Sequence, residues 1–94
     1  MNFEWDERKA AQNLRKHKVS FEEAVGVFYD PQGLDRFDEE HSSLKEERFI
    51  RLGYSKFGRI LWGVYTERKD STGLISARKA EPFERKIYEK NISS

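Results

Sequence analysis

Two β-rich segments joined by a short turn constrain the fold of this chain more than any other feature. Residues 49–55 and 60–66 are rich in aliphatic and aromatic residues, and they flank Phe57-Gly58, a dipeptide that suits a hairpin turn. A two-residue turn places Tyr54 opposite Leu61. Apolar residues then occupy both faces of the hairpin, so helices or a partner must cover the centre of the sheet on both sides.

Two helices are predicted before the hairpin. Asp6 suits the N-cap of a polar helix over residues 6–17. The apolar face of this helix is thin and consists of Ala10, Ala11 and Leu14. Ser20 and Glu23 match a capping box at the start of a second, amphipathic helix, which the turn residues 30–33 end.

Three further strands and one helix complete the predicted order. Short strands are expected over residues 3–5 and 34–37, and a third strand of the hairpin sheet over residues 74–79. The last helix begins at Pro82, and its buried side is expected to consist of Phe83 and Ile87. The prediction is an α+β fold, in which a small antiparallel sheet (a three-strand meander plus short N-terminal strands) packs with two N-terminal helices and one C-terminal helix.

Length and composition indicate one small domain over residues 1–94. The chain of 94 residues accommodates one domain, and its thirteen aromatic residues can form a core despite a charged content of 37%. A formal net charge of +1 does not by itself point to nucleic acid. The longest apolar run, residues 60–65, is far too short to span a membrane, and the first residues lack the features of a signal peptide. We therefore expect a cytoplasmic protein.

Composition argues against several kinds of active site. The chain has no cysteine, and its two histidines, His17 and His41, are 24 positions apart, so no metal-ligand spacing is present. The six glycines never form Gly-x-Gly, which argues against a phosphate-binding loop. We therefore expect neither a metal ion nor another cofactor.

Cations and aromatic rings on the predicted strands are the groups left for chemistry. Arginine and lysine side chains bind phosphates, and aromatic rings stack on bases, so this combination suits contact with RNA. The side chains concerned are Arg48, Arg51, Arg59, Arg78, Lys79, Tyr54 and Tyr65. The alternative is a solvated surface on which these cations pair with neighbouring glutamates, and composition alone favours that alternative.

Short motifs follow one another in a characteristic order along nearly the whole chain. They are Glu4-Trp5-Asp6, Lys16-His17-Lys18-Val19-Ser20-Phe21, Glu47-Arg48-Phe49-Ile50, Val64-Tyr65-Thr66-Glu67-Arg68, Ile75-Ser76-Ala77-Arg78-Lys79-Ala80 and Glu84-Arg85 followed by Tyr88-Glu89. In this order they resemble the BrnT family of bacterial toxins, from about residue 3 to residue 89. Lys18 departs from the family, which usually has a glycine there in a left-handed turn. Residues 71–74 also depart, because the family often has a basic strand at that point.

The resemblance implies a RelE-like α+β fold and a ribonuclease toxin of a type II toxin–antitoxin system. It implies a cognate antitoxin of the BrnA type, which neutralises the toxin in a hetero-oligomer and binds operator DNA. RNA cleavage would then arrest translation. The alternative that we keep open is a non-catalytic subunit of a regulatory complex, which binds nucleic acid or protein.

Metal-free RNA cleavage needs positive charge around the phosphorane and proton transfer at two oxygens. With the resemblance in view, Arg78 is predicted to hold the scissile phosphate; the alternative is a salt bridge with Glu81 or Glu84. Arg48 is predicted to be a second phosphate clamp; the alternative is a pair with Glu67 across the hairpin.

Proton transfer is predicted for His17 or Glu67. An imidazole titrates in the pH range that suits general acid or base catalysis. The alternative for His17 is a cap at the end of a helix, and the alternative for Glu67 is a structural counter-ion. The predicted RNA-binding residues are Arg59, Lys79, Arg85, Tyr65, Tyr88 and Lys16. For the two tyrosines the alternative is a place in the core.

Overall fold

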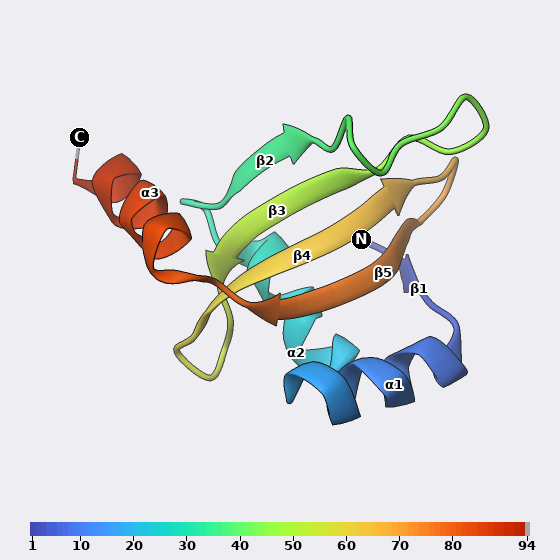
Figure 1. The fold of residues 1–94 in the computed structure, drawn as a ribbon, viewed down its shortest axis with the longest axis horizontal. Helices are drawn as coiled ribbons and strands as arrows, with labels where there is room; N and C mark the ends of the chain where they lie inside the picture. The colour runs from blue at the N-terminus through green and yellow to red at the C-terminus, as the bar shows by residue number, and fades with distance from the viewer. Residues whose placement is uncertain (94) are drawn as a thin grey trace.

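The structure, a computed structural model, describes residues 1–93 as one sheet with helices at its faces and ends (Figure 1). The elements are β1 (Phe3–Glu4), α1 (Glu7–His17), α2 (Phe21–Val25), the 3-10 helix η1 (Gly26–Tyr29), β2 (Leu34–Phe37), β3 (Phe49–Tyr54), β4 (Ile60–Glu67), β5 (Thr72–Lys79) and α3 (Pro82–Ile92). Within the described residues, no helix has both the length and the apolar character needed to cross a membrane.

The sheet has five strands in the order β1-β5-β4-β3-β2. Strands β2 to β5 pair antiparallel, and β1 adds to β5 in parallel. Helices α1 and α2 lie along one face, here called the helix face, whereas α3 packs at one end of the sheet and leaves most of the opposite, open face uncovered (Figure 1). The predicted α+β class is confirmed, and the short N-terminal strand makes the sheet mixed.

The register of the hairpin differs by one residue from the prediction. Tyr54 stands opposite Ile60, and the turn contains three residues, because the Ser55 N–H bonds to the Arg59 carbonyl at 2.7 Å. Gly58 has a φ of +79°, the left-handed conformation that a three-residue hairpin turn requires at this position. The shift turns Leu61 toward the helix face and Trp62 toward the open face.

The buried side of α3 also differs from the prediction. Phe83 and Ile87 are 59% and 51% exposed, whereas Glu84 and Tyr88 are buried. Glu84 is held because its carboxylate accepts from the Glu81 N–H and from Arg78, and the Tyr88 hydroxyl donates to Asp30. Hydrogen bonds of Glu84 and Tyr88 therefore hold this helix against the sheet, whereas the apolar pattern predicted that Phe83 and Ile87 would do so.

Helix α1 docks through an amide. Asp6 caps the helix as predicted and accepts from the N–H groups of Arg8 and Lys9 at 2.8 and 3.3 Å. Leu14 is exposed, however, and Asn13 is the buried residue of α1. The Asn13 side chain donates to the Ala77 and Val19 carbonyls and accepts from the Ala77 N–H, all at 2.8–3.0 Å. These bonds fasten α1 to β5 and satisfy the whole amide.

The predicted capping box of α2 is half present. The Ser20 hydroxyl accepts from the Glu23 N–H at 3.0 Å. The Glu23 carboxylate does not return to Ser20, because it accepts from Ser55 and Arg59 instead. The start of α2 is thus tied to the hairpin turn.

Lys18 adopts the left-handed conformation at the end of α1, with φ 59° and ψ 31°. A side chain with a Cβ is strained there, so Lys18→Gly should raise the free energy of unfolding by about 0.5–1 kcal/mol, measured by urea denaturation. The matched control is Lys16→Gly, inside the last turn of the same helix. This change should lower the free energy of unfolding by about 1 kcal/mol. Equal destabilisation by both glycines would contradict the strain argument.

Candidate functional site

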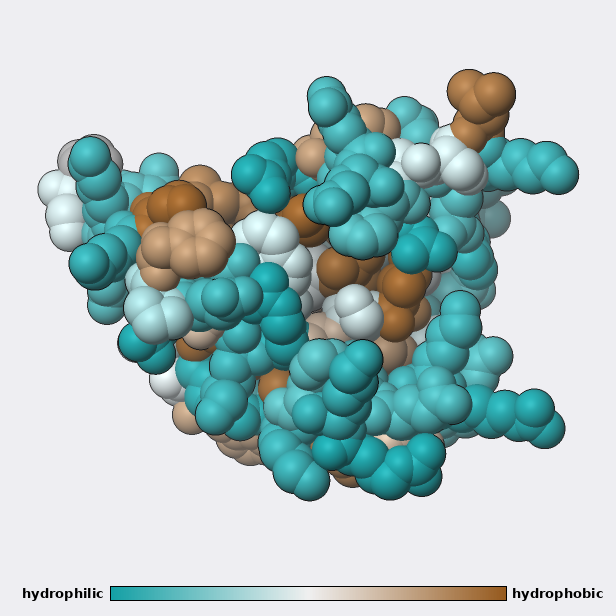
Figure 2. Space-filling model, viewed as in Figure 1, coloured by the Kyte–Doolittle hydropathy of each residue, from teal (hydrophilic) through white to brown (hydrophobic). Residues whose placement is uncertain are grey.

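Three adjoining hollows follow β5 and form one depression, here called the β5 trough. Their volumes are about 430, 280 and 350 Å³. The first and second share Arg48 and Ile75, and the second and third share His17 and Ser76. Figure 2 shows a depression on this side of the molecule, with apolar side chains on its floor and hydrophilic side chains along its borders. Residues 73–78 line the trough, a length of about 20 Å at the usual strand rise.

Arg78 stands at the α3 end of the trough and is held in place by α3. Its guanidinium donates to both Glu84 carboxylate oxygens at 2.8 and 2.9 Å and to the Lys79 carbonyl at 3.1 Å. Glu81 lies 3.7 Å from it, so both partners of the predicted alternative are present. Within the described chain, no acceptor contacts the Arg78 Nε. Arg78 is thereby fixed in position and keeps an N–H group for a ligand.

The charge of the Arg78–Glu84 pair is stabilised mutually. Burial acts to raise the pKa of Glu84, but hydrogen bonds from Arg78 and the Glu81 N–H outweigh burial and hold that pKa below its usual value. The same bond to Glu84 raises the pKa of Arg78. A buried carboxylate thus orients a cation that faces solvent on its other side.

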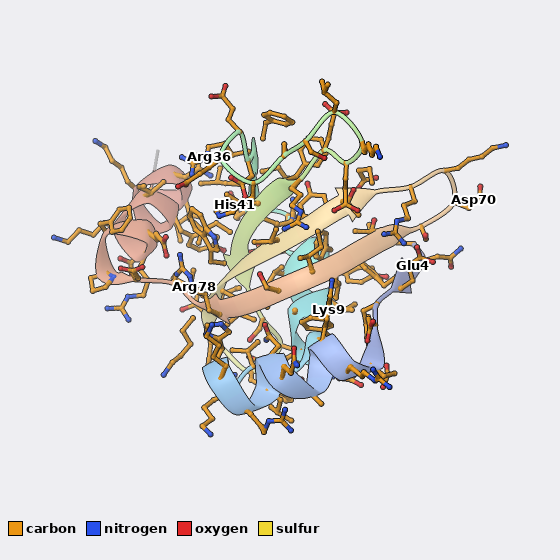
Figure 3. All side chains as sticks on the ribbon, turned by 45° about the vertical axis from the view of Figure 1, so that its right-hand side comes forward. Glu4, Lys9, Arg36, His41, Asp70 and Arg78 are labelled. Carbon is orange, nitrogen blue, oxygen red and sulfur yellow. The ribbon has the colours of Figure 1, made fainter. Side chains whose placement is uncertain are left out.

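Trp62 forms the floor beside Arg78. The Arg78 guanidinium carbon lies 4.9 Å from the centre of the indole ring, and that of Arg36, from β2, lies 5.6 Å from it. Both distances suit cation–π contacts. Two guanidinium groups therefore lie over one ring at this end of the trough. Figure 3 shows both arginines toward the α3 end of the sheet.

The middle hollow is cationic. Lys9, Lys16, His17 and Arg48 line it, and no carboxylate is among its lining residues. Arg48 contacts Glu46 at 3.2 Å, with each side chain about one third exposed. Such a surface pair contributes roughly 0–1 kcal/mol, so Arg48 is weakly held. The predicted alternative pair with Glu67 is absent from the described chain, because the register shift places Glu67 elsewhere.

The structure brings four of the predicted site residues into the trough. His17, the last residue of α1, lies where the middle hollow meets that of Arg78. Lys16 and Arg48 line the middle hollow. Arg78, His17, Arg48 and Lys16 thus share a continuous surface, although they come from two elements, α1 and β5, and from the loop before β3.

Four predicted charged residues lie outside the trough. Glu67 is exposed, accepts from the Thr72 hydroxyl at 3.3 Å and stands five residues beyond Trp62 on β4, or about 17 Å along the strand. Arg59 is paired with Glu23 near the hairpin turn. Lys79 and Arg85 are exposed on β5 and α3, and neither lines the trough. The roles predicted for them therefore have no geometric support from a shared surface.

Tyr65 and Tyr88, which were predicted to bind RNA, lie instead in the core, which was the alternative for both. Tyr65 lies on the helix face and donates to Asp35 at 2.7 Å. Tyr88, on the buried side of α3, donates to Asp30. Burial, together with the carboxylate that each hydroxyl contacts, raises the pKa of both phenols well above the usual value. Neither hydroxyl reaches the trough.

Several trough residues were missed by the sequence analysis. Trp62, Arg36, Asp38 and His41 all line the Arg78 hollow. The loop after β2 returns to the start of β3, where the Asp38 N–H bonds to the Arg48 carbonyl at 2.8 Å. The Asp-x-x-His spacing of residues 38–41 was the one signal in the sequence, because it lets a carboxylate meet an imidazole within one turn. Residues 1–93 contain no group of three or more His, Cys, Asp or Glu side chains suited to a metal ion.

Comparisons with known proteins agree on the kind of fold. The model of a family described as the ribonuclease toxin BrnT of type II toxin–antitoxin systems matches residues 5–84. The 1.1 Å crystal structure of the Brucella abortus ribonuclease toxin BrnT is similar, with a TM-score of 0.58, at 20% sequence identity over 86% of this chain and 97% of that chain. No curated protein matches. The structural likeness confirms the predicted α+β fold.

Proposed function

The chain belongs to the BrnT family of ribonuclease toxins of type II toxin–antitoxin systems, and from this premise we propose that it cleaves RNA in the β5 trough without a metal ion. The observation that supports the proposal is the middle hollow, which is lined by cations and lies beside Arg78. A phosphodiester backbone is attracted to such a surface. RNA would therefore enter along β5 with a phosphate between Arg48 and Arg78.

The reaction that these groups support is attack by the ribose 2′-oxygen on the adjacent phosphorus. The 2′-oxygen–phosphorus bond forms as the bond to the 5′-oxygen breaks, and the products are a 2′,3′-cyclic phosphate and a 5′-hydroxyl. Arg78, held by Glu84, stabilises the added negative charge of the phosphorane, and Arg48 assists it. His17 donates the proton that the leaving 5′-oxygen needs. Glu67 has no part in this scheme because of its distance along β4.

An RNA assay in excess EDTA tests this proposal. Purified protein is incubated with end-labelled RNA, and we expect cleavage that survives chelation and leaves 2′,3′-cyclic phosphate ends. A 2′-O-methyl RNA of the same sequence is the control, because it lacks the nucleophile and should stay intact. Cleavage that stops in EDTA and returns with a divalent ion would contradict the metal-free scheme. A gel shift without cleavage would support the non-catalytic alternative.

We further propose that a BrnA-type antitoxin neutralises this toxin, that the two form a hetero-oligomer, and that operator DNA is bound only through the antitoxin. Family membership supports a cognate antitoxin. RNA cleavage in the cytoplasm would then arrest translation. Copurification of the toxin with the product of an adjacent reading frame, and loss of RNA cleavage in that complex, would test this part. Full activity of the complex would contradict it.

A further inference from the structure

A histidine–carboxylate pair lies in the same hollow as Arg78. His41 Nδ1 stands 3.0 Å from Asp38 Oδ2, and both residues line the hollow together with Trp62 and Arg78. The Asp38 side chain is 8% exposed and that of His41 is 61% exposed. The carboxylate is thus covered while the ring it contacts is open to a ligand, an arrangement unlike that of a surface ion pair with two exposed partners.

The loop that carries the pair is fastened to β3. The Asp38 N–H donates to the Arg48 carbonyl at 2.8 Å, and the Ser42 hydroxyl accepts from the Arg48 N–H at 2.8 Å. Both ends of the segment 38–42 are therefore tied to one residue of the trough. Figure 3 shows His41 and Arg78 on the same side of the sheet, near α3, with Lys9 farther along the trough.

The contact with Asp38 defines the chemistry of the imidazole. An ionised carboxylate only accepts hydrogen bonds, so this contact favours the tautomer of the neutral imidazole in which Nδ1 carries the proton and Nε2 the lone pair. A carboxylate in this position holds the tautomer and stabilises the imidazolium that forms when Nε2 takes a proton. His41 therefore has the form that a general base requires.

We propose that His41 is the general base of RNA cleavage and that Asp38 is its positioning residue; this inference rests on the function proposed above. His41 Nε2 takes the proton of the ribose 2′-hydroxyl as the 2′-oxygen–phosphorus bond forms. Arg78 stabilises the phosphorane, the bond to the 5′-oxygen breaks, and His17 gives that oxygen its proton. Exchange with water then removes the proton from His41 and returns one to His17.

The test uses the full chain and one synthetic RNA in two forms. The cleavage site of the wild type in EDTA is mapped first, and the RNA is then made with either the ordinary 5′-oxygen or a bridging 5′-sulfur at that site. Sulfur leaves without a proton, so the sulfur form does not need a general acid. Single-turnover rates are measured for His41→Ala, His41→Gln, Asp38→Asn and His17→Ala. Glu39→Gln, which changes an exposed neighbouring carboxylate outside the trough, is the matched control.

We expect His41→Ala and His41→Gln to slow cleavage of both RNA forms by about 10²–10⁴-fold. Asp38→Asn should slow cleavage of both RNA forms by about tenfold or more, whereas Glu39→Gln should cleave both at the wild-type rate. His17→Ala should slow the oxygen form far more than the sulfur form. The affinity for the 2′-O-methyl RNA should stay within about twofold in the His41 variants, because a base acts on the reaction and not on binding.

Three results would overturn the inference while leaving the proposed function intact. The first is a wild-type cleavage rate in both His41 variants. The second is a wild-type rate of the His41 variants on the RNA with the 5′-sulfur. The third is a loss of affinity for the 2′-O-methyl RNA as large as the loss of cleavage rate. Equal rates in Asp38→Asn and Glu39→Gln would overturn the role of Asp38. Failure of the wild type to cleave RNA in EDTA would instead overturn the proposed function, and this inference with it.

Discussion

We expect Arg78→Ala to lower the single-turnover rate of RNA cleavage by about 10²–10³-fold, which is the loss typical when one preorganised donor to a developing negative charge is removed. The guanidinium is already fixed by its two bonds to Glu84 and by the ring of Trp62, so little reorganisation precedes the reaction. Rates are measured with end-labelled RNA in EDTA. The matched control is Arg8→Ala, which changes an exposed arginine on α1 outside the trough and should retain the wild-type rate.

Loss of Arg78 also leaves a buried carboxylate without its partner, so stability must be separated from catalysis. Glu84 is 2% exposed, and an unpaired charge there destabilises the fold. Arg78→Lys keeps a cation beside Glu84 but loses the paired guanidinium donors, and it should remain folded at 25 °C by circular dichroism while cleaving at a much reduced rate. Wild-type cleavage by folded Arg78→Lys would show that the planar donor pair is unnecessary.

Arg59→Ala should lower the free energy of unfolding by about 3 kcal/mol at pH 7, the lower part of the range for breaking a buried ion pair. Glu23 is 3% exposed and accepts from Arg59 Nε at 2.9 Å and from the Ser55 hydroxyl at 2.7 Å. The hydrogen bond from Arg59 is the largest influence on the pKa of Glu23 and holds it below its usual value, against burial. Urea denaturation measures the loss, with Arg8→Ala as the control.

The pH dependence of this effect follows from the same pair. A lowered pKa in the folded state stabilises the fold above the ordinary pKa of the carboxyl, and this contribution is lost as the pH falls through the lowered value. In Arg59→Ala, the buried Glu23 carboxylate loses its guanidinium partner, so its pKa should rise and its protonation should stabilise the variant at mildly acidic pH. The difference in the free energy of unfolding between wild type and Arg59→Ala should therefore become smaller from pH 7 toward pH 4. The double variant Glu23→Gln/Arg59→Ala should be more stable than Arg59→Ala alone. A difference that is constant with pH would contradict the argument.

Arg59→Ala also distinguishes the role predicted from the sequence from the role that the contacts support. The sequence predicts that Arg59 binds RNA, whereas in the structure its guanidinium donates to Glu23 and to the Lys18 carbonyl. If its role is structural, the affinity of the folded variant for 2′-O-methyl RNA equals that of Arg8→Ala. A greater loss of affinity would support the contact with RNA.

Local patterns predicted the elements, but single residues decided how the elements fit together. Asp6 and the hairpin segments follow rules that act within a few residues, and the structure confirms them. The register depended on whether the turn has two or three residues, and the bond from the Ser55 N–H to the Arg59 carbonyl shows that it has three. The buried side of α3 depended on Arg78 and Asp30, partners that are distant in sequence or lie in another element. A pattern of apolar residues carries no information about such polar anchors.

The candidate site was predictable to the extent that its residues lie in recognisable motifs. Arg78, Arg48, His17 and Lys16 belong to segments that resemble the BrnT family, and they meet in the trough. Arg36, His41 and Trp62 were missed because each enters the hollow through a tertiary contact. The one-residue shift in register turns Trp62 to the open face, and the return of residues 38–42 to β3 brings in His41.

The amide of Asn13 has a consequence for how this sheet can associate. Strand β1 pairs with only the first part of the outer edge of β5. Farther along this edge, the Asn13 side chain accepts from the N–H of Ala77 and donates to its carbonyl, as the backbone of a neighbouring strand would. A foreign strand that approaches at Ala77 finds these two groups already engaged. Growth of the sheet by strand addition, whether by an antitoxin segment or by aggregation, is thus blocked at this point and must begin elsewhere.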